Sequence, residues 1–389
     1  MFGVKDGFNI IIGNPPYVQV RKGIVSKEQY PYSEGKDKGK QNLYKLFVEA
    51  SYNFLKLNGI SCLIVQSSLM CDLSSSFTRE LLLTKTSLIS VIEFPQTPKN
   101  IINKIFKSVL QGTCIVIFKK RQPSKDSVFG ISINNDASTI KSLVFENFVQ
   151  SSIKESFPSR FEIPLIEKGE MSIISKIKVL PRLESKISDS LQGNINTIHL
   201  SEIRSEKPTD IFIVKGANVH KYCIDSECFF GKNNKQVNTL VNENHTAGAV
   251  IITQNITCAT GRYRIHAAYA ECKKTNFVFL NSVNILYLPN PRIAKIILAI
   301  LNSNLMDWLF RKTSTNNHCN MYELVELPIA TATQEEQKEI IVLVDKIMTI
   351  KQKDNQADTS SLEQQIDKLV YKLYHLTEEE IKIVENRLE

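Results

Sequence analysis

The feature that most constrains the fold of this chain is a short apolar run that stops abruptly at a polar residue. Residues Phe8–Gly13 read Phe-Asn-Ile-Ile-Ile-Gly and are followed at once by Asn14-Pro15-Pro16-Tyr17. Such an Ile-rich run is typical of a buried strand, and two prolines end it because they lack the backbone N–H. The sequence therefore predicts an α/β sheet with a stiff ledge at the carboxyl end of this strand, where open α/β folds bind their ligands.

The four residues of this ledge suit the chemistry of a planar amine. An exocyclic aromatic amine such as adenine N6 is a poor nucleophile, because its lone pair is delocalised into the ring. Two acceptors aimed at its hydrogens favour the pyramidal, reactive form, and Asn14 can offer its side-chain oxygen and Pro15 its backbone carbonyl. Tyr17 can supply a face on which a base stacks. Such a site needs no carboxylate base.

The ledge resembles the catalytic motif of N6-adenine DNA methyltransferases that use S-adenosylmethionine. The resemblance implies that the four residues from Asn14 to Tyr17, including Pro16, are catalytic, and that Asn14 and Pro15 also border the cofactor. It further implies that Tyr17 stacks on an adenine flipped out of the duplex. The plainer alternative is an ordinary strand followed by a Pro-Pro turn.

The order of elements after the ledge favours the second half of a doubly wound, Rossmann-like sheet. A helical pattern runs from Leu43 to Leu57, and Asn58-Gly59 is expected to cap that helix. Further along the chain we expect a strand at 60–65, an amphipathic helix around 77–83, and strands at 88–94 and 113–118. In gamma-class adenine methyltransferases the same order ends in an antiparallel pair of strands.

An aromatic residue near the end of that family's last strand stacks on the flipped base. The segment Ile115-Val116-Ile117-Phe118-Lys119 matches it, so the resemblance assigns base stacking to Phe118. The alternative is a core phenylalanine at a strand end, because Phe is among the residues most often buried.

One part of the family pattern is missing from this sequence. In the family, the glycine-rich turn that holds the methionine portion of the cofactor precedes the motif, but only thirteen residues precede Asn14 here. The later glycines are isolated, and none lies in a Gly-x-Gly turn after a strand. The strand at 8–13 would then be an uncovered edge, which is an aggregation template. We expect a further polypeptide or domain to carry the missing N-terminal half of the methyltransferase.

The second half of the chain resembles the target-recognition domain of the TaqI-like family, which is related to type I specificity subunits. The matching features are Val214–Val219 followed by Tyr222, the pair Ile251-Ile252, the basic turn Gly261–Arg264, the helix with Leu301–Leu305, and Glu326–Ile329. With this resemblance the sequence divides into a partial catalytic domain (1–122), a connector (123–163), an α+β recognition domain (164–330) and a C-terminal helical segment (331–389).

The charge of the chain is compatible with double-stranded DNA as a partner. The formal net charge is +8 and the isoelectric point is near 8.9, which alone is weak evidence. The candidate DNA contacts are Lys119, Lys120, Arg121, Lys215, Lys232, Lys235, Arg262 and Arg264. For Arg262 and Arg264, direct reading of a base edge is one option, and phosphate contact is the commoner one.

Local signals in the last 60 residues predict helices. Thr333 with Glu336 and Thr377 with Glu380 have the form of capping boxes, and an apolar stripe runs from Ile340 to Ile347. These helices are expected to pack on the recognition domain or on a partner; a solvated coiled coil is the alternative. The eight cysteines lack a Cys-x-x-Cys pair, so no metal site is predicted. No apolar run of about 18 residues occurs, which favours a cytoplasmic protein.

The sequence thus predicts an adenine-N6 DNA methyltransferase polypeptide of a restriction-modification or related defence system, active together with the missing half. A second hypothesis is a DNA-binding specificity module whose methyltransferase remnant is inactive; the absent glycine turn favours it and the intact Asn14–Tyr17 ledge opposes it. A third is methylation of another planar nitrogen in RNA or protein, against which the large recognition region argues.

Overall fold

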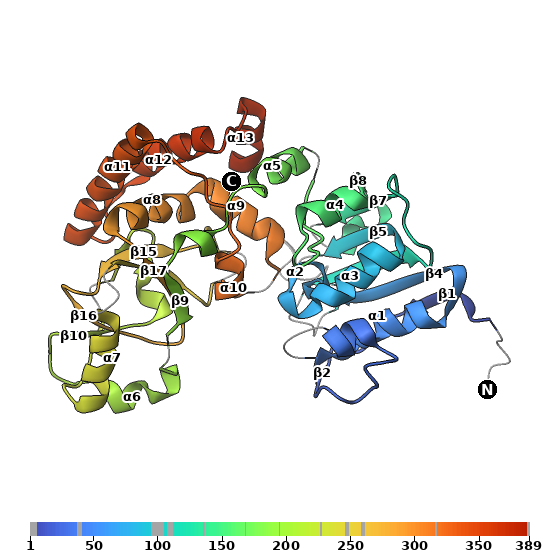
Figure 1. Ribbon diagram of the computed structural model, residues 1–389, viewed down its shortest axis with the longest axis horizontal. Helices are drawn as coiled ribbons and strands as arrows, with labels where there is room; N and C mark the ends of the chain where they lie inside the picture. Colours follow the sequence, from blue (N-terminus) through green and yellow to red (C-terminus); the bar gives the residue numbers. More distant parts are fainter. Residues whose placement is uncertain are drawn as a thin grey trace. The chain divides into compact units, whose positions relative to one another are not determined.

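The computed structural model describes residues 6–36, 41–94, 105–106, 112–134, 137–167, 169–193, 195–225, 228–245, 249–257, 261–315 and 317–386. They form two compact units (Figure 1). The first unit comprises Met1–Lys178 and Lys312–Asn316, and the second comprises Val179–Arg311 and Asn317–Glu389. The domain boundaries predicted at residues 122, 163 and 330 remain predictions.

The first unit is built on a six-stranded mixed sheet with the order β1-β4-β6-β5-β7-β8. Its strands are β1 Phe8–Gly13, β4 Leu55–Gln66, β5 Ser87–Phe94, β6 Thr113–Lys119, β7 Val128–Ile133 and β8 Glu146–Val149. Strands β1, β4, β5 and β7 run in one direction, and β6 and β8 run in the other. This sheet confirms the α/β class and the predicted antiparallel strand. Its strands β7 and β8 lie within the stretch predicted to be a connector.

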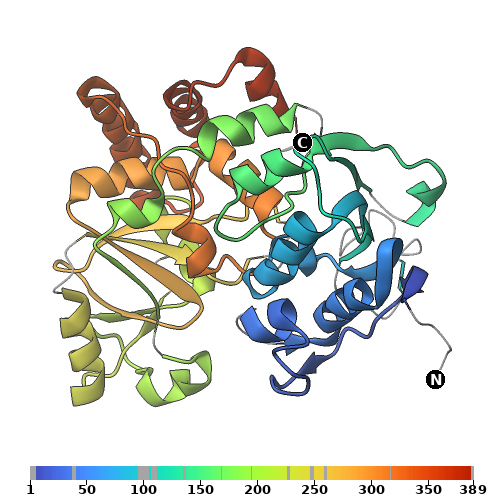
Figure 2. The same cartoon turned by 45° about the vertical axis from the view of Figure 1, so that its right-hand side comes forward.

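Helices α1 Leu43–Phe54, α3 Ser76–Lys85 and α4 Gln150–Ser156 cover one face of this sheet (Figures 1 and 2). Helix α2 Ser68–Cys71 contacts α3, and α5 Glu170–Ile177 lies away from the sheet. A short ribbon, β2 Gln19–Val20 with β3 Gln41–Asn42, precedes α1. The hydroxyl of Ser61 on β4 donates to that of Ser51 on α1 at 3.1 Å, so Ser61 marks the covered face. Because neighbours alternate along a strand, Ile60 and its register partner Ile10 point to the opposite face.

The predicted cap at Asn58-Gly59 is wrong. Helix α1 ends earlier, at Phe54, and β4 starts at Leu55, so both residues lie inside a strand. Asn58 adopts a left-handed φ of 67°, and its N–H donates to the carbonyl of Lys120 at 2.9 Å. The Asn-Gly pair marks an irregularity in the β1–β4 register, where a Cβ on Gly59 would lie 2.7 Å from the carbonyl oxygen of Phe8. Asn and Gly tolerate this backbone as well as they tolerate a helix cap.

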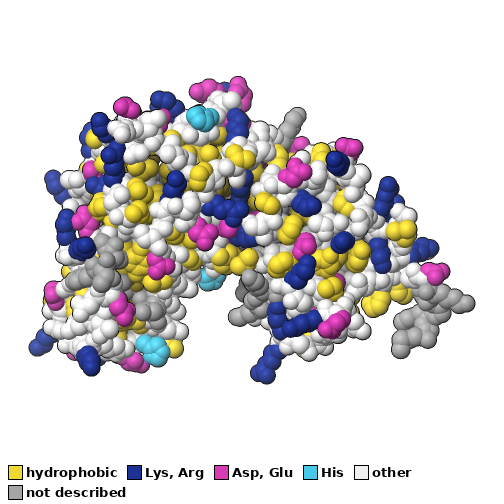
Figure 3. Space-filling model, in the orientation of Figure 1, with side chains coloured by type: hydrophobic (Ala, Val, Ile, Leu, Met, Phe, Trp, Pro, Cys, Tyr) yellow, Lys and Arg dark blue, Asp and Glu magenta, His cyan; other side chains and the backbone are white. Residues whose placement is uncertain are grey.

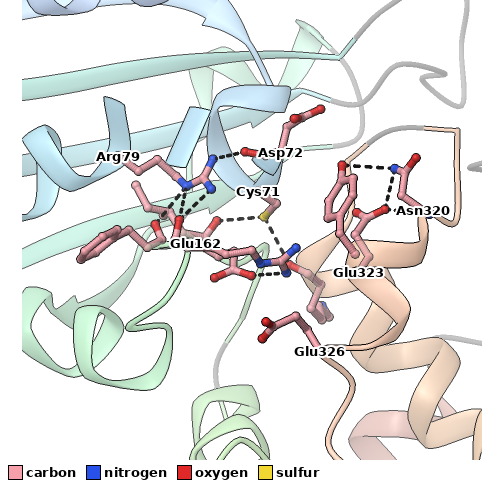
Figure 4. Close-up of polar contacts among 12 residues, drawn as sticks. Cys71, Asp72, Arg79, Glu162, Asn320, Glu323 and Glu326 are labelled. Carbon is pink, nitrogen blue, oxygen red and sulfur yellow. Dashed lines mark hydrogen bonds and ion pairs between the residues drawn. The ribbon is translucent and has the colours of Figure 1, made fainter. Parts of the chain in front are cut away.

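A fully buried arginine fixes the segment after β4 within the first unit (Figure 4). Arg79 of α3 donates to the carbonyls of Leu69 and Asp72 at 2.9 and 2.7 Å, and to those of Arg160 and Phe161 at 2.8 and 3.0 Å. Four backbone acceptors from two distant segments thus share one guanidinium, which joins the chain around residue 160 to the core beside the ledge.

The second unit contains several small sheets. Its strands are β9 Asp189–Gln192, β10 Ile211–Val214, β11 Val219–His220, β12 Cys223–Ile224, β13 Phe229–Phe230, β14 Ala249–Gln254, β15 Ala267–Glu271, β16 Asn276–Phe279 and β17 Val283–Leu288. They form a four-stranded sheet β15-β14-β17-β9, a three-stranded sheet β13-β10-β16 and a two-stranded ribbon β11-β12. The pair Ile251-Ile252, one of the features of the predicted recognition domain, lies in β14.

The helices of the second unit pack on its sheets and on one another (Figure 1). They are α6 Leu200–Ile203, α7 Lys235–His245, α8 Pro291–Leu301, α9 Asn304–Thr313, α10 Met321–Leu324, α11 Gln334–Lys353, α12 Ser360–Leu373 and α13 Glu378–Glu385. Helix α8 lies on the four-stranded sheet, and α7 contacts β16 of the three-stranded sheet. Helix α11 contacts α8 and α12, so the C-terminal helices pack on this unit as predicted. Both predicted capping boxes are present. Within the described part of the chain no single helix is long and apolar enough to cross a membrane, although the bent pair α8 and α9 passes that test together.

Candidate active site and nucleic-acid interface

The ledge lies at the carboxyl edge of the first unit's sheet. Gly13, the last residue of β1, pairs in parallel with Leu63 of β4, so the ends of both strands meet at this edge. Asn14 and Pro16 are exposed, whereas Pro15 is buried. The buried proline fixes the path of the chain. The amide of Asn14 is thereby presented at the edge where α/β sheets bind ligands.

The ring of Tyr17, three residues after Asn14, is held by Ile64 and Tyr44. Its hydroxyl donates to the carbonyl of Ile64 at 3.1 Å, and burial raises the pKa of this phenol above its usual range. The ring of Tyr44 meets it edge-on, with the centroids 6.4 Å apart and an interplanar angle of 86°. Tyr44 is itself buried, and its hydroxyl bonds Ser68 and Ser75 at 3.1 and 3.0 Å. The ring of Tyr17 therefore has a fixed orientation.

A second aromatic ring, which was not predicted from the sequence, lies at this site. The ring of Phe106 lies 6.4 Å from that of Tyr17, at an interplanar angle of 79°, and it is partly buried. Phe106 comes from the stretch between β5 and β6, where it is the one aromatic residue of the sequence. A large aromatic side chain in the segment that follows a strand end is the signal that could have indicated it. The structure thus brings Phe106 to Tyr17, three residues after Asn14.

The prediction that Phe118 stacks on a base is wrong. Phe118 is fully buried and pairs in register with Ser61, so its ring points to the face covered by α1. Strand β6 runs antiparallel to β4, and its last residues therefore lie at the amino end of β1, away from Asn14. The alternative, a core phenylalanine at a strand end, describes Phe118, because no part of its ring is available to a ligand.

The basic residues after Phe118 also lie at the far end of the sheet. Lys119 pairs with Ile60, whose partner on β1 is Ile10, four residues before Asn14. The ammonium of Lys120 donates to the carbonyls of Asn53 and Leu55 at 3.2 and 2.7 Å, and lies 5.0 Å from the centre of the Tyr52 ring. Partial burial lowers the pKa of Lys120. Lys120 thus binds the end of α1 rather than a phosphate, whereas Lys119 and the exposed Arg121 stay predictions.

Two polar side chains at the same edge as Asn14 were also missed. Glu93, one residue before the end of β5, is 6% exposed, and burial raises the pKa of its carboxyl to about 8, against the opposing effect of the Ser67 hydroxyl. Gln66 ends β4, and its side-chain oxygen accepts from Asn42 at 3.4 Å. Asn42 also caps α1 by accepting from the N–H of Tyr44. A polar residue at the carboxyl end of a strand was the available sequence signal.

In the second unit, the prediction that Arg264 contacts DNA is wrong. Arg264 is 2% exposed, and its guanidinium donates to Thr257 Oγ1 and to the carbonyl of His318, both at 3.2 Å. It lies 5.1 Å from the centre of the Phe310 ring, and burial lowers its pKa. Arg264 therefore stabilises the interior of the turn. Its neighbour Arg262 is exposed.

The other predicted DNA contacts of the second unit lie around β13. The ammonium of Lys215 lies 4.8 Å from the centre of the Phe229 ring, and the Arg204 guanidinium, which the sequence reading missed, lies 4.3 Å from that ring. Lys232 follows β13 and donates to the carbonyl of Glu202 at 2.7 Å, and Lys235 is exposed at the start of α7. On the face drawn in Figure 3, basic and acidic side chains are interspersed among the described residues, so charge alone does not define the DNA surface.

The carboxylates and imidazoles of the two units do not form a cation site in the described part of the chain. No group of three or more His, Cys, Asp or Glu side chains there has an arrangement that could hold a metal ion.

Comparisons with known proteins give one match in the first unit and one in the second. Residues 1–100 match the sequence profile of the Eco57I restriction-modification methylase family, and residues 212–329 match that of the TaqI-like C-terminal specificity domain. Over 397 aligned residues the chain is 25% identical to a Methanocaldococcus jannaschii protein named as a type II restriction enzyme and methyltransferase, RM.MjaORFECS2P. The match covers 95% of this chain and 31% of that protein, so the chain spans about a third of the relative's length.

Solved structures of low identity share the fold. A nuclease-deletion mutant of the Type ISP restriction-modification enzyme LlaGI, in complex with a DNA substrate mimic, has a TM-score of 0.54 at 9% identity, covering 88% of this chain and 41% of that one. The DrdV–DNA complex has a TM-score of 0.51 at 11% identity, covering 88% and 44%. The chain is thus similar to the Eco57I restriction-modification methylase family over residues 1–100 and to the TaqI-like C-terminal specificity domain over residues 212–329.

Proposed function

We propose that this chain is the catalytic-motif and specificity part of a site-specific adenine-N6 DNA methyltransferase in a restriction-modification or related defence system. The observation that carries the proposal is the exposed Asn14 at the carboxyl edge of the sheet, three residues before Tyr17, whose fixed ring meets the ring of Phe106. A polar acceptor next to aromatic faces suits a planar base that carries an exocyclic amine.

The residues of the ledge would act on a flipped adenine in complementary ways. The side-chain oxygen of Asn14 and the carbonyl of Pro15 accept the two N6 hydrogens, which concentrates the lone pair on N6. The ring of Tyr17 stacks on the base, and Phe106 closes on it from the other side. Stacking of about 1–3 kcal/mol per contact offsets the few kcal/mol needed to unstack the base.

The methyl donor in this proposal is S-adenosylmethionine, which supplies an electrophilic methyl group when bound. Asn14 and Pro15 fit a place beside it, because the amide of Asn14 is exposed at the ligand-binding edge while Pro15 is anchored in the fold. Their task is to hold N6 in line with the methyl group and to keep its lone pair available. The N6 proton released after transfer passes to solvent.

An uncovered surface next to the ledge supports the need for a complementing segment. Strand β1 is the edge of the sheet, and Ile10 and Ile12 on it are 63% and 78% exposed. Ile60 on β4, the register partner of Ile10, is 36% exposed on the same face. A doubly wound sheet carries further strands beside such an edge and helices on both faces. We propose that a polypeptide or domain with the cofactor-binding half of the methyltransferase covers this surface.

Target recognition is assigned in this proposal to the second unit. Its match to a specificity domain supports this assignment, and so does the exposed Arg262 in the turn after residue 260. A guanidinium at such a turn can form a bidentate contact with a guanine edge, or it can hold a phosphate.

Replacement of Asn14 tests the proposal directly in the enzyme complemented with its cofactor-binding half. Asn14→Ala should abolish methyl transfer to duplex DNA and leave DNA affinity within a few-fold, because the side chain acts on N6 rather than on the DNA backbone. Asn14→Asp retains one acceptor oxygen and should keep measurable turnover. The matched control is Asn53→Ala, an exposed asparagine of α1 in the same unit. Parental turnover by Asn14→Ala would refute the assignment.

A further inference from the structure

A short turn in the second unit has its backbone fixed by one helix. We call residues Gly261–Arg264 the recognition tip. From α9, the guanidinium of Arg311 donates to the carbonyls of Gly261 and Arg262 at 2.8 and 3.0 Å. On the same helix, the carboxylate of Asp307 accepts from the N–H of Arg264 at 2.5 Å and from that of Ile265 at 3.2 Å. The path of the tip is therefore set before any ligand binds.

The side chains of the recognition tip are oriented by cation–π contacts with the Tyr263 ring. The guanidinium of Arg262 lies 5.5 Å from the centre of the Tyr263 ring. The ammonium of Lys221 lies 4.1 Å from the centre of the same ring. The ring thus contacts two cations, one of them exposed and the other largely buried. Cation–π attraction holds each cation near the ring.

A carboxylate on the C-terminal helix α12 makes this arrangement possible. Glu363 pairs with Lys221 at 2.7 Å, and the side chains are only 20% and 11% exposed. The other carboxylate oxygen of Glu363 accepts from the hydroxyl of Thr359, which is 3% exposed, at 2.7 Å. The backbone after Lys221 is equally constrained, because Tyr222 is buried with a left-handed φ of 67° and donates to the carbonyl of Ala267 at 2.8 Å.

The charges decide what happens when this contact is lost. Lys221 and Arg262 carry like charges close to the Tyr263 ring, so they repel each other. The carboxylate of Glu363 compensates the positive charge of Lys221. Without that carboxylate, a largely buried ammonium has no counter-ion in this contact and moves toward water. Tyr263 then loses the cation on one side, and the Arg262 guanidinium loses its fixed support.

We infer that Glu363 of α12 is a positioning residue for sequence reading by Arg262, acting through Lys221 and Tyr263. This inference rests on the proposed function, because it requires the second unit to read DNA. It assigns to the C-terminal helix a role in specificity without any contact to DNA. Only the orientation of Arg262 depends on Glu363, since the backbone of the tip is held by α9.

The test compares variants of the full chain on a pool of duplexes with a randomised segment. Sequencing of the duplexes bound by the parent chain gives its preferred base at each position, and a preferred duplex and a scrambled one then give a specificity ratio. Arg262→Ala should remove the preference at one base pair. Glu363→Gln should lower the ratio at that same base pair by about 2- to 30-fold, the range over which indirect contacts alter coupling. Glu339→Gln, which removes one charge from the exposed face of α11, should leave the ratio unchanged.

Further variants separate positioning from folding and from charge. We call the contacts from Glu363 through Lys221 and Tyr263 to Arg262 the relay. Lys221→Gln removes the cation between Glu363 and Tyr263 and should lower the preference at the same base pair, whereas Lys221→Arg should largely retain it. The slope of affinity against salt should be unchanged in Glu363→Gln, since Glu363 neutralises no phosphate. If Glu363→Gln and Lys221→Gln keep the parental preference while Arg262→Ala loses it, the relay is refuted and DNA reading stands. If Arg262→Ala has no effect on DNA binding, both the relay and the proposed reading by this tip are refuted.

Discussion

At the scale of single residues, base stacking should depend on Phe106 and not on Phe118. Phe106→Ala in the complemented enzyme should lower methyl transfer by about tenfold or more, because a stacked base loses about 1–3 kcal/mol and 1.36 kcal/mol corresponds to a factor of ten. The fluorescence gain of 2-aminopurine at the target position should fall as well. Phe106→Tyr keeps the ring and serves as the matched control. Parental turnover and fluorescence in Phe106→Ala would exclude stacking by this residue.

The position of the ledge could be predicted because its setting is local. Asn14 and Tyr17 follow β1 directly, and two prolines fix their path, so neighbouring residues were enough to predict an exposed ledge. Phe118 and Arg264 depend on distant parts of the chain. Phe118 is buried because β6 runs antiparallel to β4, and the Arg264 guanidinium is buried because Thr257, Phe310 and His318 surround it. The burial of these two side chains could not be predicted, because strand direction and distant partners cannot be inferred from the neighbouring residues.

At the scale of elements, the stability of the segment after β4 should depend on Arg79. Replacement by Met removes the donor to four buried carbonyls, each of which costs about 1–3 kcal/mol when left unpaired. Differential scanning calorimetry of the full chain should show a clearly lower transition temperature for the first unit, with the second unit unchanged. Arg121→Met, at an exposed position of the same unit, should have little effect. Equal transitions for the two variants would show that the buried network does not carry this stability.

Most helices and strands were predictable because their boundaries are set by short-range chemistry. The capping boxes at Thr333 and Thr377 fixed the starts of α11 and α13. The helix expected to contain Leu301–Leu305 is instead the junction of two helices, α8 and α9, which meet at a bend of 64°. Asn302, at the break, exchanges hydrogen bonds with the backbone of Ala267 at 3.0 and 2.9 Å. Only the tertiary partner of Asn302 explains this break, so the apolar pattern alone did not indicate it.

At the scale of the whole molecule, cofactor binding should require the complementing half. The isolated chain should bind S-adenosylmethionine weakly or not at all in a calorimetric titration, because the exposed Ile10 and Ile12 mark a surface that the cofactor-binding half would cover. Addition of that half should restore binding and bury this surface, which a decrease in heat capacity on association would report. Micromolar binding by the isolated chain would refute the need for a complement.

The identity of the methylated base tests the central claim most directly. The complemented enzyme is incubated with duplex DNA and isotopically labelled S-adenosylmethionine, and the DNA is digested to nucleosides for mass spectrometry. The ledge of Asn14 and Tyr17 beside Phe106 predicts label in N6-methyldeoxyadenosine, and loss of that label in Asn14→Ala. Label on a cytosine, or label in N6-methyldeoxyadenosine that persists at the parental level in Asn14→Ala, would contradict the account.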